Sequence, residues 1–232
     1  KGFIMGKNDN GNNGRTELVF VVDRSGSMGG LESDTIGGFN SMLSKQRTIA
    51  GECRVTTLLF DHRIETLHNH LDIREVNDLT SRDYWVRGST ALLDAIGLAI
   101  DRMIVTQRHT AAAYRAQHVL FVIITDGYEN ASRRYSLHQI KQMITYERER
   151  YHWEFVFLGA NIDAEQTAGD FGISPRCATD FHADGQGIKA SFEAVACAAT
   201  AVRGGADLDD LSAPDFLGGV RDDYRSRRRM KR

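Results

Sequence analysis

Short apolar runs alternate along the chain with segments whose apolar residues recur at helical spacing. Residues 17–23 and 118–125 are apolar at almost every position, a pattern typical of strands buried on both faces of a sheet. Residues 31–47 instead place their apolar side chains mainly three and four positions apart, as one face of a helix requires. This alternation of strands and helices favours a parallel sheet covered by helices.

The complete pattern predicts a doubly wound α/β fold with a mostly parallel sheet, helices on both faces and one short antiparallel edge strand. The edge strand is residues 63–70, which we expect to pair as a hairpin with residues 54–61. Residues 71–88 give no clear helical pattern. The expected strands are residues 17–23, 54–61, 63–70, 118–125, 154–158 and 177–181. The expected helices are residues 31–47, 91–107, 136–146, 163–171 and 186–202.

These elements span residues 16–202, which we expect to form one domain. Residues 1–15 are expected to be a flexible N-terminal segment. Residues 203–232 are expected to be a charged C-terminal tail, because residues 206–223 hold six aspartates and residues 225–232 hold six basic residues. The tail is interpreted either as a disordered, solubilising segment or as a contact, through Arg225 to Arg232, for nucleic acid or an acidic partner.

Composition narrows the classes of function. The 29 Lys and Arg residues nearly balance the 31 Asp and Glu residues, so bulk attraction to nucleic acid or membrane is not expected. The longest apolar runs are far shorter than the roughly 20 residues of a membrane span. Cys53, Cys177 and Cys197 are widely separated and form no zinc or redox motif. The first residues lack the pattern of a signal peptide, so we expect a cytoplasmic location.

Small oxygen-bearing side chains lie at or beside the ends of the expected strands. Because parallel strands of such a fold end at one edge of the sheet, we expect these side chains to converge there. Carboxylate and hydroxyl oxygens suit a hard divalent cation, whereas zinc and copper sites prefer imidazole or thiolate ligands. The five residues are Asp23, Ser25, Ser27, Thr90 and Asp126.

The segments that hold these residues, DRSGS, GST and ITDG, resemble the metal-ion-dependent adhesion site (MIDAS) of von Willebrand factor type A (vWA) domains. The resemblance covers about residues 16–202. It implies that Ser25, Ser27 and Thr90 bind the cation directly, while Asp23 and Asp126 bind it directly or through water. It implies Mg²⁺ as the cofactor, with Mn²⁺ and Ca²⁺ as alternatives. One coordination position would stay open for an Asp or Glu carboxylate of a protein partner.

Further residues near the motifs are expected at the rim of the partner-binding surface. The alternative for these residues is that they are ordinary loop residues. The alternative for the five ligand residues is that Asp23 and Asp126 cap helices and that the serines satisfy turn backbone groups. The rim residues are Arg24, Met28, Tyr84, Tyr128, Glu129 and Asn130.

Three other polar residues occur near the expected hairpin. Asp61, at the end of a strand, is expected to stabilise a turn. His68 and His70 are two positions apart and are expected on one solvated strand face. Metal binding by this pair is the alternative, but no third soft ligand lies nearby in the sequence.

The sequence therefore predicts a non-enzymatic, metal-dependent protein interaction module within a multiprotein complex. A metal-dependent hydrolase is the first alternative, and it needs a general base beside the cation, for which Glu129 is nearest in sequence. A nucleotide-binding protein is disfavoured, because neither glycine-rich phosphate motif follows the first strand. A nucleic-acid-associated protein that uses the basic tail is the second alternative.

Overall fold

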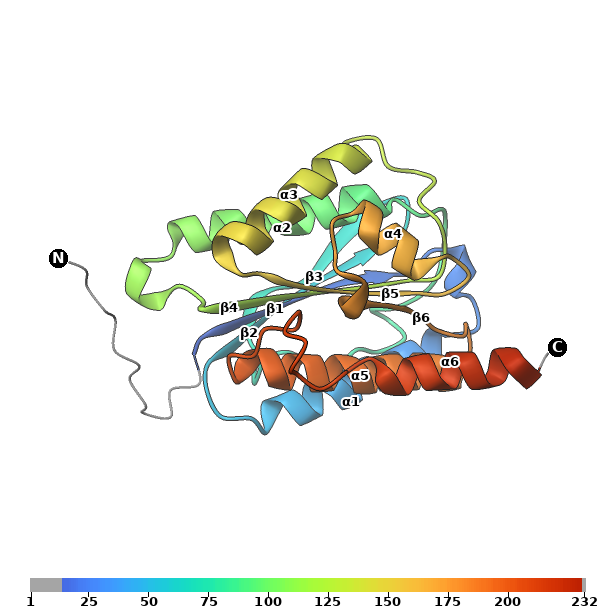
Figure 1. Cartoon of the computed structure of the whole chain (residues 1–232). Coiled ribbons are helices and arrows are strands. Elements are labelled where there is room, and N and C mark those ends of the chain that lie inside the picture. The colour runs from blue at the N-terminus through green and yellow to red at the C-terminus, as the bar shows by residue number, and fades with distance from the viewer. Residues whose placement is uncertain (1–13, 231–232) are drawn as a thin grey trace.

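Figure 1 shows the computed structural model, which describes residues 14–230 of the chain. Its centre is a six-stranded sheet with the strand order β3-β2-β1-β4-β5-β6. β3 runs antiparallel to β2, and every other neighbouring pair is parallel. The strands are β1 (Thr16–Asp23), β2 (Cys53–Phe60), β3 (Ile64–Asp72), β4 (His118–Thr125), β5 (Glu154–Gly159) and β6 (Ala178–Asp180).

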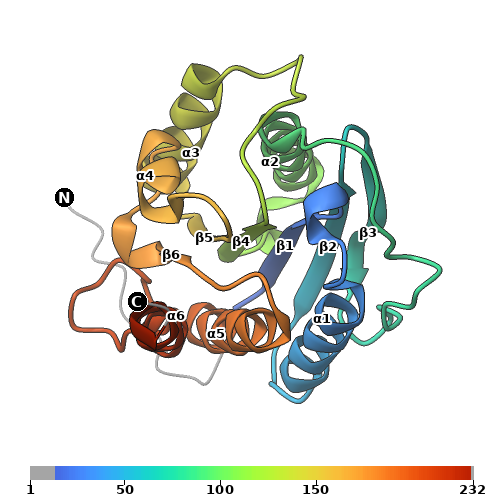
Figure 2. The ribbon, with the colours of Figure 1, turned by 90° about the vertical axis from the view of Figure 1, so that its right-hand side faces the viewer.

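Helices cover both faces of this sheet, as Figure 1 and Figure 2 show. One layer consists of α1 (Glu32–Arg47), α5 (Gly185–Arg203) and α6 (Gly218–Met230). The other layer consists of α2 (Leu92–His109), α3 (Leu137–Tyr151) and α4 (Ala164–Asp170). All of β1, and all of β4 after His118, is buried between the layers. The predicted doubly wound, mostly parallel α/β fold is confirmed.

Two elements differ in length from the sequence expectation. β3 was expected to be short, but it has nine residues and is the longest strand of the sheet. α3 continues through the charged run 147–150 to Tyr151. A capping box between Ser136 and Gln139 begins this helix, and His152, in the left-handed conformation with φ of 55°, ends it.

A bulge in the β2–β3 pairing separates the two histidines of the hairpin. The pairing register shifts between Val55 and Thr57. His68 is only 7% exposed, and its Nδ1 lies 3.0 Å from Thr57 Oγ1. His70 has φ of 55°, and its Nδ1 lies 2.8 Å from Glu17 Oε1. The expected shared, solvated face is therefore wrong, because a bulge breaks the strict alternation of side chains along a strand.

The strand order changes direction at β1. From β1 the chain first adds β2 and β3 on one side, and then β4, β5 and β6 on the other. Loops that leave the carboxyl ends of β1 and β4 diverge there, which is where sheets of this kind bind ligands. Asp23 is the last residue of β1, and Asp126 directly follows β4.

The long segment between β3 and α2, residues 73–91, contains no helix or strand. Side chains of α1 hold it in place. Arg47 donates a hydrogen bond to the carbonyl of Val76 at 2.6 Å, and Asn40 exchanges two hydrogen bonds with the backbone of Leu79. Val76 and Leu79 are buried. The segment therefore follows a fixed path beside α1 despite its irregular backbone.

The segment after residue 202 differs from the expected disordered tail as far as it is described. α6 contacts α5 and β6, and Leu217 and Val220 are buried against the domain. Arg221 and Arg227 form ion pairs with aspartates of the same chain. The charges that indicated disorder instead hold a helix on the body of the protein.

The division of the chain at residues 15 and 202 stays a prediction. The expected flexible N-terminal segment lies, up to residue 13, outside the described residues. Within residues 14–230, no helix combines the length and the apolar character needed to cross a membrane.

Two leucines of the C-terminal segment test whether it is packed. Leu217 is fully buried, whereas Leu211 is 88% exposed. We expect Leu217→Ala to lower the free energy of unfolding by about 3 kcal/mol, because it leaves a cavity in the core, and Leu211→Ala to change it by less than about 0.5 kcal/mol. Urea denaturation measures both values. Equal, small effects would show that the segment does not contribute to the folded core.

Candidate metal centre

The Asp23 carboxylate is fully buried and joins two loops of the site. Its Oδ1 accepts a hydrogen bond from Ser25 N at 2.6 Å. Its Oδ2 accepts hydrogen bonds from Thr125 Oγ1 at 2.7 Å and from Asp126 N at 3.3 Å. None of the ion pairs among the described residues includes Asp23. The loop after β1 and the loop after β4 are thus tied together through one uncompensated negative charge.

Three hydroxyl groups lie around the same point. Ser25 Oγ and Ser27 Oγ are 3.0 Å apart. A Cβ atom at Gly127, the residue after Asp126, would lie 3.3 Å from Ser27 Oγ and 3.7 Å from Thr90 Oγ1. Glycine at this position therefore keeps open the space that the two hydroxyls face. All five predicted ligand residues are brought together at the carboxyl end of β1 and β4.

Backbone hydrogen bonds fix the loop that holds Thr90. Thr90 N donates to Asn130 Oδ1 at 2.9 Å, and Thr90 O accepts from Asn130 N and Ala131 N at 3.0 and 3.1 Å. Gly26 N donates to Gly88 O at 3.1 Å and joins this loop to the first one. The three loops therefore support one another, so the positions of the hydroxyls do not depend on a flexible segment.

Two carboxyl groups share this buried region. Burial raises the pKa of Asp23, while hydrogen bonds from Thr125 and Ser25 lower it in part. Burial raises the pKa of Asp126 to about 6; the hydrogen bond from Asn161 Nδ2 opposes this rise, and the negative charge of Asp23 adds to it. A divalent cation would favour the ionised form of both groups.

The donor set fits a hard divalent cation. Two carboxylates and three hydroxyls supply oxygen only, the ligand type that such cations prefer. No group of three or more His, Cys, Asp and Glu side chains is placed to hold a metal ion anywhere in residues 14–230. A metal centre at this point therefore depends on the serine and threonine hydroxyls as much as on the two carboxylates.

Three of the expected rim residues are buried behind the site instead of lining its surface. Met28 is fully buried in the core. Tyr84 is 1% exposed and donates its hydroxyl to Asp23 O at 2.6 Å. Arg24 is also 1% exposed, and its Nε donates to Asp61 Oδ2 at 3.1 Å. These residues hold in place residues 23–30, the segment with three of the predicted ligands, which we call the metal loop. Their expected place on the rim is therefore wrong.

The other three expected rim residues lie nearer the surface. Tyr128 is 61% exposed, and its hydroxyl oxygen accepts a hydrogen bond from Asp163 N at 3.3 Å. The Glu129 carboxylate accepts hydrogen bonds from three backbone N–H groups and one serine hydroxyl. Asn130 holds the backbone of Thr90, as described above. Glu129 and Asn130 therefore shape the loops around the site, and Tyr128 remains available at its surface.

Asp61 has the expected turn role and a second one. Its Oδ1 accepts from Arg63 N at 2.7 Å, and its Oδ2 accepts from Arg24 Nε at 3.1 Å and from Arg87 Nε at 2.8 Å. Burial raises the pKa of Asp61, but the hydrogen bonds and positive charges around it lower the pKa more, so that the net shift is downward. Asp61 thereby links the hairpin, the metal loop and residues 73–91.

Sequence reasoning missed two residues of the site, Thr125 and Asn161. Thr125, immediately before Asp126, could have been found as the last strand residue at the same sheet edge. Asn161 has φ of 54°, a conformation that asparagine tolerates better than most residues. Its contact with Asp126 depends on β5 pairing beside β4, which no local pattern in the sequence indicates.

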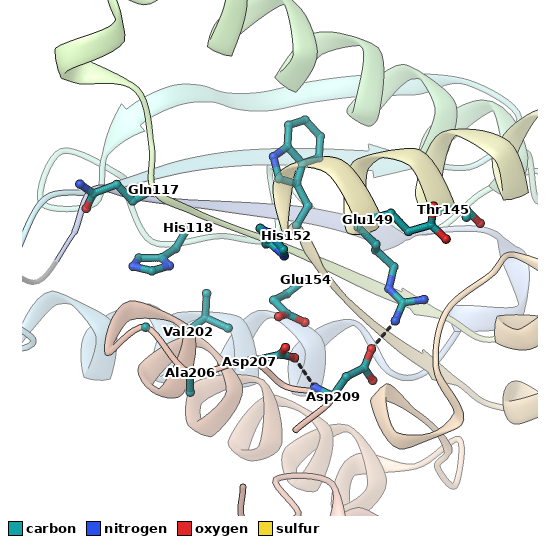
Figure 3. A pocket seen from close by; sticks show the side chains of 13 residues that line it. Gln117, His118, Thr145, Glu149, His152, Glu154, Val202, Ala206, Asp207 and Asp209 are labelled. Atoms are coloured by element: carbon teal, nitrogen blue, oxygen red, sulfur yellow. Dashed lines mark hydrogen bonds and ion pairs between the residues drawn. The ribbon is translucent and has the colours of Figure 1, made fainter. Parts of the chain in front are cut away.

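A cavity of about 660 Å³ lies elsewhere, at the opposite end of the sheet (Figure 3). His118 and Glu154, the first residues of β4 and β5, line it together with Asp207 and Asp209. Burial raises the pKa of Glu154 to about 7, and the two neighbouring aspartates add to the rise. Because Asp126 follows the other end of β4, this cavity is separate from the metal centre.

Comparison with protein-family models gives no match, and comparison with curated proteins gives none either. Among solved structures, the chain is similar to a von Willebrand factor type A protein from Catenulispora acidiphila, with a TM-score of 0.52 and 10% identity over 79% of this chain and 42% of that one. The chain has a vWA-like fold. The proximal thread matrix protein 1 of the mussel byssus, solved with a zinc-occupied MIDAS motif, is also similar, with a TM-score of 0.56 and 15% identity over 81% of this chain and 46% of that one.

The vWA-like fold of this chain is also similar to the pilus adhesin SpaC of Lactobacillus rhamnosus GG. The TM-score is 0.59, with 12% identity over 80% of this chain and 30% of that one. In each of the three comparisons, the chain spans less than half of the other protein. Identities of this size show a shared fold alone.

The raised pKa of Asp126 predicts how the metal-free protein responds to pH. Between about pH 4 and about pH 6, folded Asp126 binds more protons than the unfolded chain does, so the free energy of unfolding falls as pH rises. We expect Asp126→Asn to remove this loss of stability. Above the shifted pKa, the free energy of unfolding of the variant should exceed that of the wild type by about 2 kcal/mol. Urea denaturation in EDTA measures both values.

Asp222→Asn is the matched control for this measurement, because Asp222 is exposed on α6. This control should keep the pH dependence of the wild type. A variant at Asp126 that loses stability at every pH would contradict the assigned charge penalty.

Proposed function

We propose that this chain is a metal-dependent protein interaction module that acts within a multiprotein complex and catalyses no reaction. The five predicted ligand residues would hold Mg²⁺, which would supply a binding position for an Asp or Glu carboxylate of a protein partner. The observation that carries this proposal is the convergence of five oxygen-bearing side chains beside Gly127 at the carboxyl end of the sheet. The residues proposed to hold the cation are Asp23, Ser25, Ser27, Thr90 and Asp126.

The donor set also supports the choice of a carboxylate partner. Three of the five donors are neutral hydroxyls, so part of the charge of the cation is left for an external ligand. Metal and partner should then strengthen each other's binding by the same factor. The zinc-occupied MIDAS motif of the mussel protein supports a divalent cation at this kind of site. Mg²⁺ as the resident ion is our proposal, with Mn²⁺ and Ca²⁺ as alternatives.

A metal-dependent hydrolase remains the first alternative, and the surroundings of Glu129 weigh against it. A general base needs a free lone pair directed at the attacking water. Both oxygens of Glu129 already accept hydrogen bonds, from Leu93 N to Oε2 and from two further N–H groups to Oε1. The nearest acidic residue in sequence is thus engaged in holding loops, which supports a binding role for the centre.

Nucleic-acid binding through the basic C-terminus is the second alternative. Arg225, Arg228 and Arg229 are exposed, whereas Arg221 and Arg227 are engaged in ion pairs within the described residues. Fewer free cations weaken counterion-driven binding to nucleic acid. The cytoplasmic location expected from the sequence stays a prediction.

Metal binding itself can be tested by thermal unfolding. We expect Mg²⁺ or Mn²⁺ to raise the melting temperature of the wild type but not of Ser25→Ala or Thr90→Ala, because each variant lacks one donor. At a metal concentration of about one hundred times the dissociation constant, the stabilisation should be about 2.7 kcal/mol.

Ser89→Ala is the matched control, since Ser89 is exposed beside Thr90. It should respond to metal as the wild type does. The same rise in all four proteins would place the metal outside the assigned centre.

Partner binding can be tested by affinity purification with mass spectrometry, in Mg²⁺ and in EDTA. We expect the wild type to retain partner proteins in Mg²⁺ and to release them in EDTA. Thr90→Ala should not retain these proteins even in Mg²⁺. Retention that is equal in Mg²⁺ and EDTA would show that the interface does not involve the metal.

A further inference from the structure

Trp85 lies beside the candidate metal centre with a large part of its ring exposed. It is one of two tryptophans in the chain, and it is 42% exposed, whereas Trp153 is 6% exposed. Trp85 belongs to residues 73–91, the irregular segment between β3 and α2. An indole is costly to leave in water, and tryptophan is among the residues that contribute most to binding at protein interfaces.

Two residues close to Trp85, Tyr84 and Arg87, are attached to the metal loop. The hydroxyl of Tyr84 donates to Asp23 O at 2.6 Å. Arg87 N donates to Arg24 O at 2.9 Å. These two contacts involve Asp23, a predicted metal ligand, and Arg24, the next residue. The position of Trp85 relative to the metal centre is therefore set by the same hydrogen bonds that hold the metal loop.

Two guanidinium groups pack against the Trp85 ring. The guanidinium carbon of Arg87 lies 4.3 Å from the ring centroid, and that of Arg24 lies 5.5 Å from it. Both arginines donate to Asp61 Oδ2, and Asp61 is fully buried. Cation–π contacts with anchored arginines hold the indole in one orientation. A fixed aromatic surface loses little entropy when a partner binds to it.

One partly exposed cation, Arg87, lies at this surface with hydrogen-bond donors to spare. Arg87 is part exposed, with 32% of its side chain accessible, and its Nη atoms donate no hydrogen bond to the described residues. The charge of Arg24, in contrast, is compensated within the chain, because its Nη2 pairs with Glu65 of β3 at 2.8 Å. A carboxylate that approached the metal would therefore pass a surface with free guanidinium N–H groups, which bind carboxylates strongly.

We propose that Trp85 and Arg87 form the second contact for the protein partner of the metal centre. The occupant is an acidic segment in which an aromatic or large apolar side chain lies within a few residues of the carboxylate that completes the cation's coordination. The apolar side chain packs on Trp85, and a second carboxylate of the segment pairs with Arg87. This inference rests on the proposed function, because it assigns the chemistry of the same partner.

A phage-displayed library of random peptides tests the proposal without knowledge of the natural partner. The library is bound to the wild-type chain in Mg²⁺ and eluted with EDTA. We expect the eluted peptides to combine an Asp or Glu with an aromatic or large apolar residue nearby. Synthetic copies of these peptides should bind Trp85→Ala at least tenfold more weakly than the wild type, and Trp85→Phe should recover most of the affinity.

Tyr114→Ala is the matched control. Tyr114 is an aromatic residue with 66% exposure that also packs against an arginine, Arg15, at 5.0 Å. It lies just before β4, at the end of the sheet opposite the metal centre. Peptide affinity should not change in this variant. The affinity of each variant for Mn²⁺ alone, measured by calorimetry, should equal that of the wild type and show that the metal loop is intact.

The outcomes separate this inference from the proposed function. EDTA-eluted peptides that bind Trp85→Ala within twofold of the wild type would overturn the role of Trp85 and leave the metal-dependent module standing. A library that yields no EDTA-eluted peptide would overturn both. If Trp85→Ala does not fold, Trp153→Phe leaves Trp85 as the single indole, and its fluorescence must then change when a peptide binds. An unchanged emission spectrum with bound peptide would also overturn the role of Trp85.

Discussion

The arrangement of loops at the carboxyl end of β1 and β4 depends on one buried carboxylate, Asp23, that has no cationic partner among the described residues. Asp23 is fully buried, and among the described residues its carboxylate accepts hydrogen bonds from Ser25, Thr125 and Asp126. Burying an ionised carboxylate costs several kcal/mol unless a cation or hydrogen bonds offset it. The donors Ser25 N, Thr125 Oγ1 and Asp126 N offset part of that cost, and in doing so they fix the paths of both loops. The second carboxylate, Asp126, adds repulsion that these donors do not remove.

A second carboxylate lies just after the neighbouring strand β2, and it has cationic partners within the chain. Asp61, just after β2, is as deeply buried as Asp23, but the guanidinium groups of Arg24 and Arg87 donate to it. Its pKa is shifted down, whereas the pKa of Asp23 is shifted up. Two solvent-inaccessible acids at the same end of the sheet thus differ in the groups that face them. The carboxylate of Asp61 has its cationic partners within the chain, whereas the carboxylate of Asp23 has none among the described residues and would gain one from the proposed cation.

The sequence was informative where local pattern determines structure. The apolar runs of β1 and β4, and the oxygen-bearing residues after them, could be placed because parallel strands end at a common edge. The burial of Arg24, Met28 and Tyr84 could not be predicted, since a loop carries no periodicity that separates inward from outward positions. The same limit explains Asn161, whose contact with Asp126 requires β5 to pair beside β4. Helix α6 was missed for another reason: its charges indicate disorder, and the ion pair of Arg227 with Asp184, 43 residues away at the start of α5, has no signal in the sequence.

The metal loop and the surface formed by Trp85 and Arg87 are both held by Asp61. Different side chains nevertheless form the two surfaces, so each surface can be altered by its own substitution. Asp61 holds Arg24 and Arg87 together, so a change at Asp61 would disturb the backbone beside Asp23 and the support of Trp85 at once. Ser25 and Thr90 are proposed to bind the cation through their hydroxyls, and the indole of Trp85 touches no predicted ligand side chain in the described contacts. A partner that engages both surfaces would meet loops already ordered by hydrogen bonds and would pay little entropy to bind. The common anchor therefore favours affinity, and the separate side chains favour specificity, because a carboxylate without a suitable neighbour would satisfy the cation but leave the indole exposed.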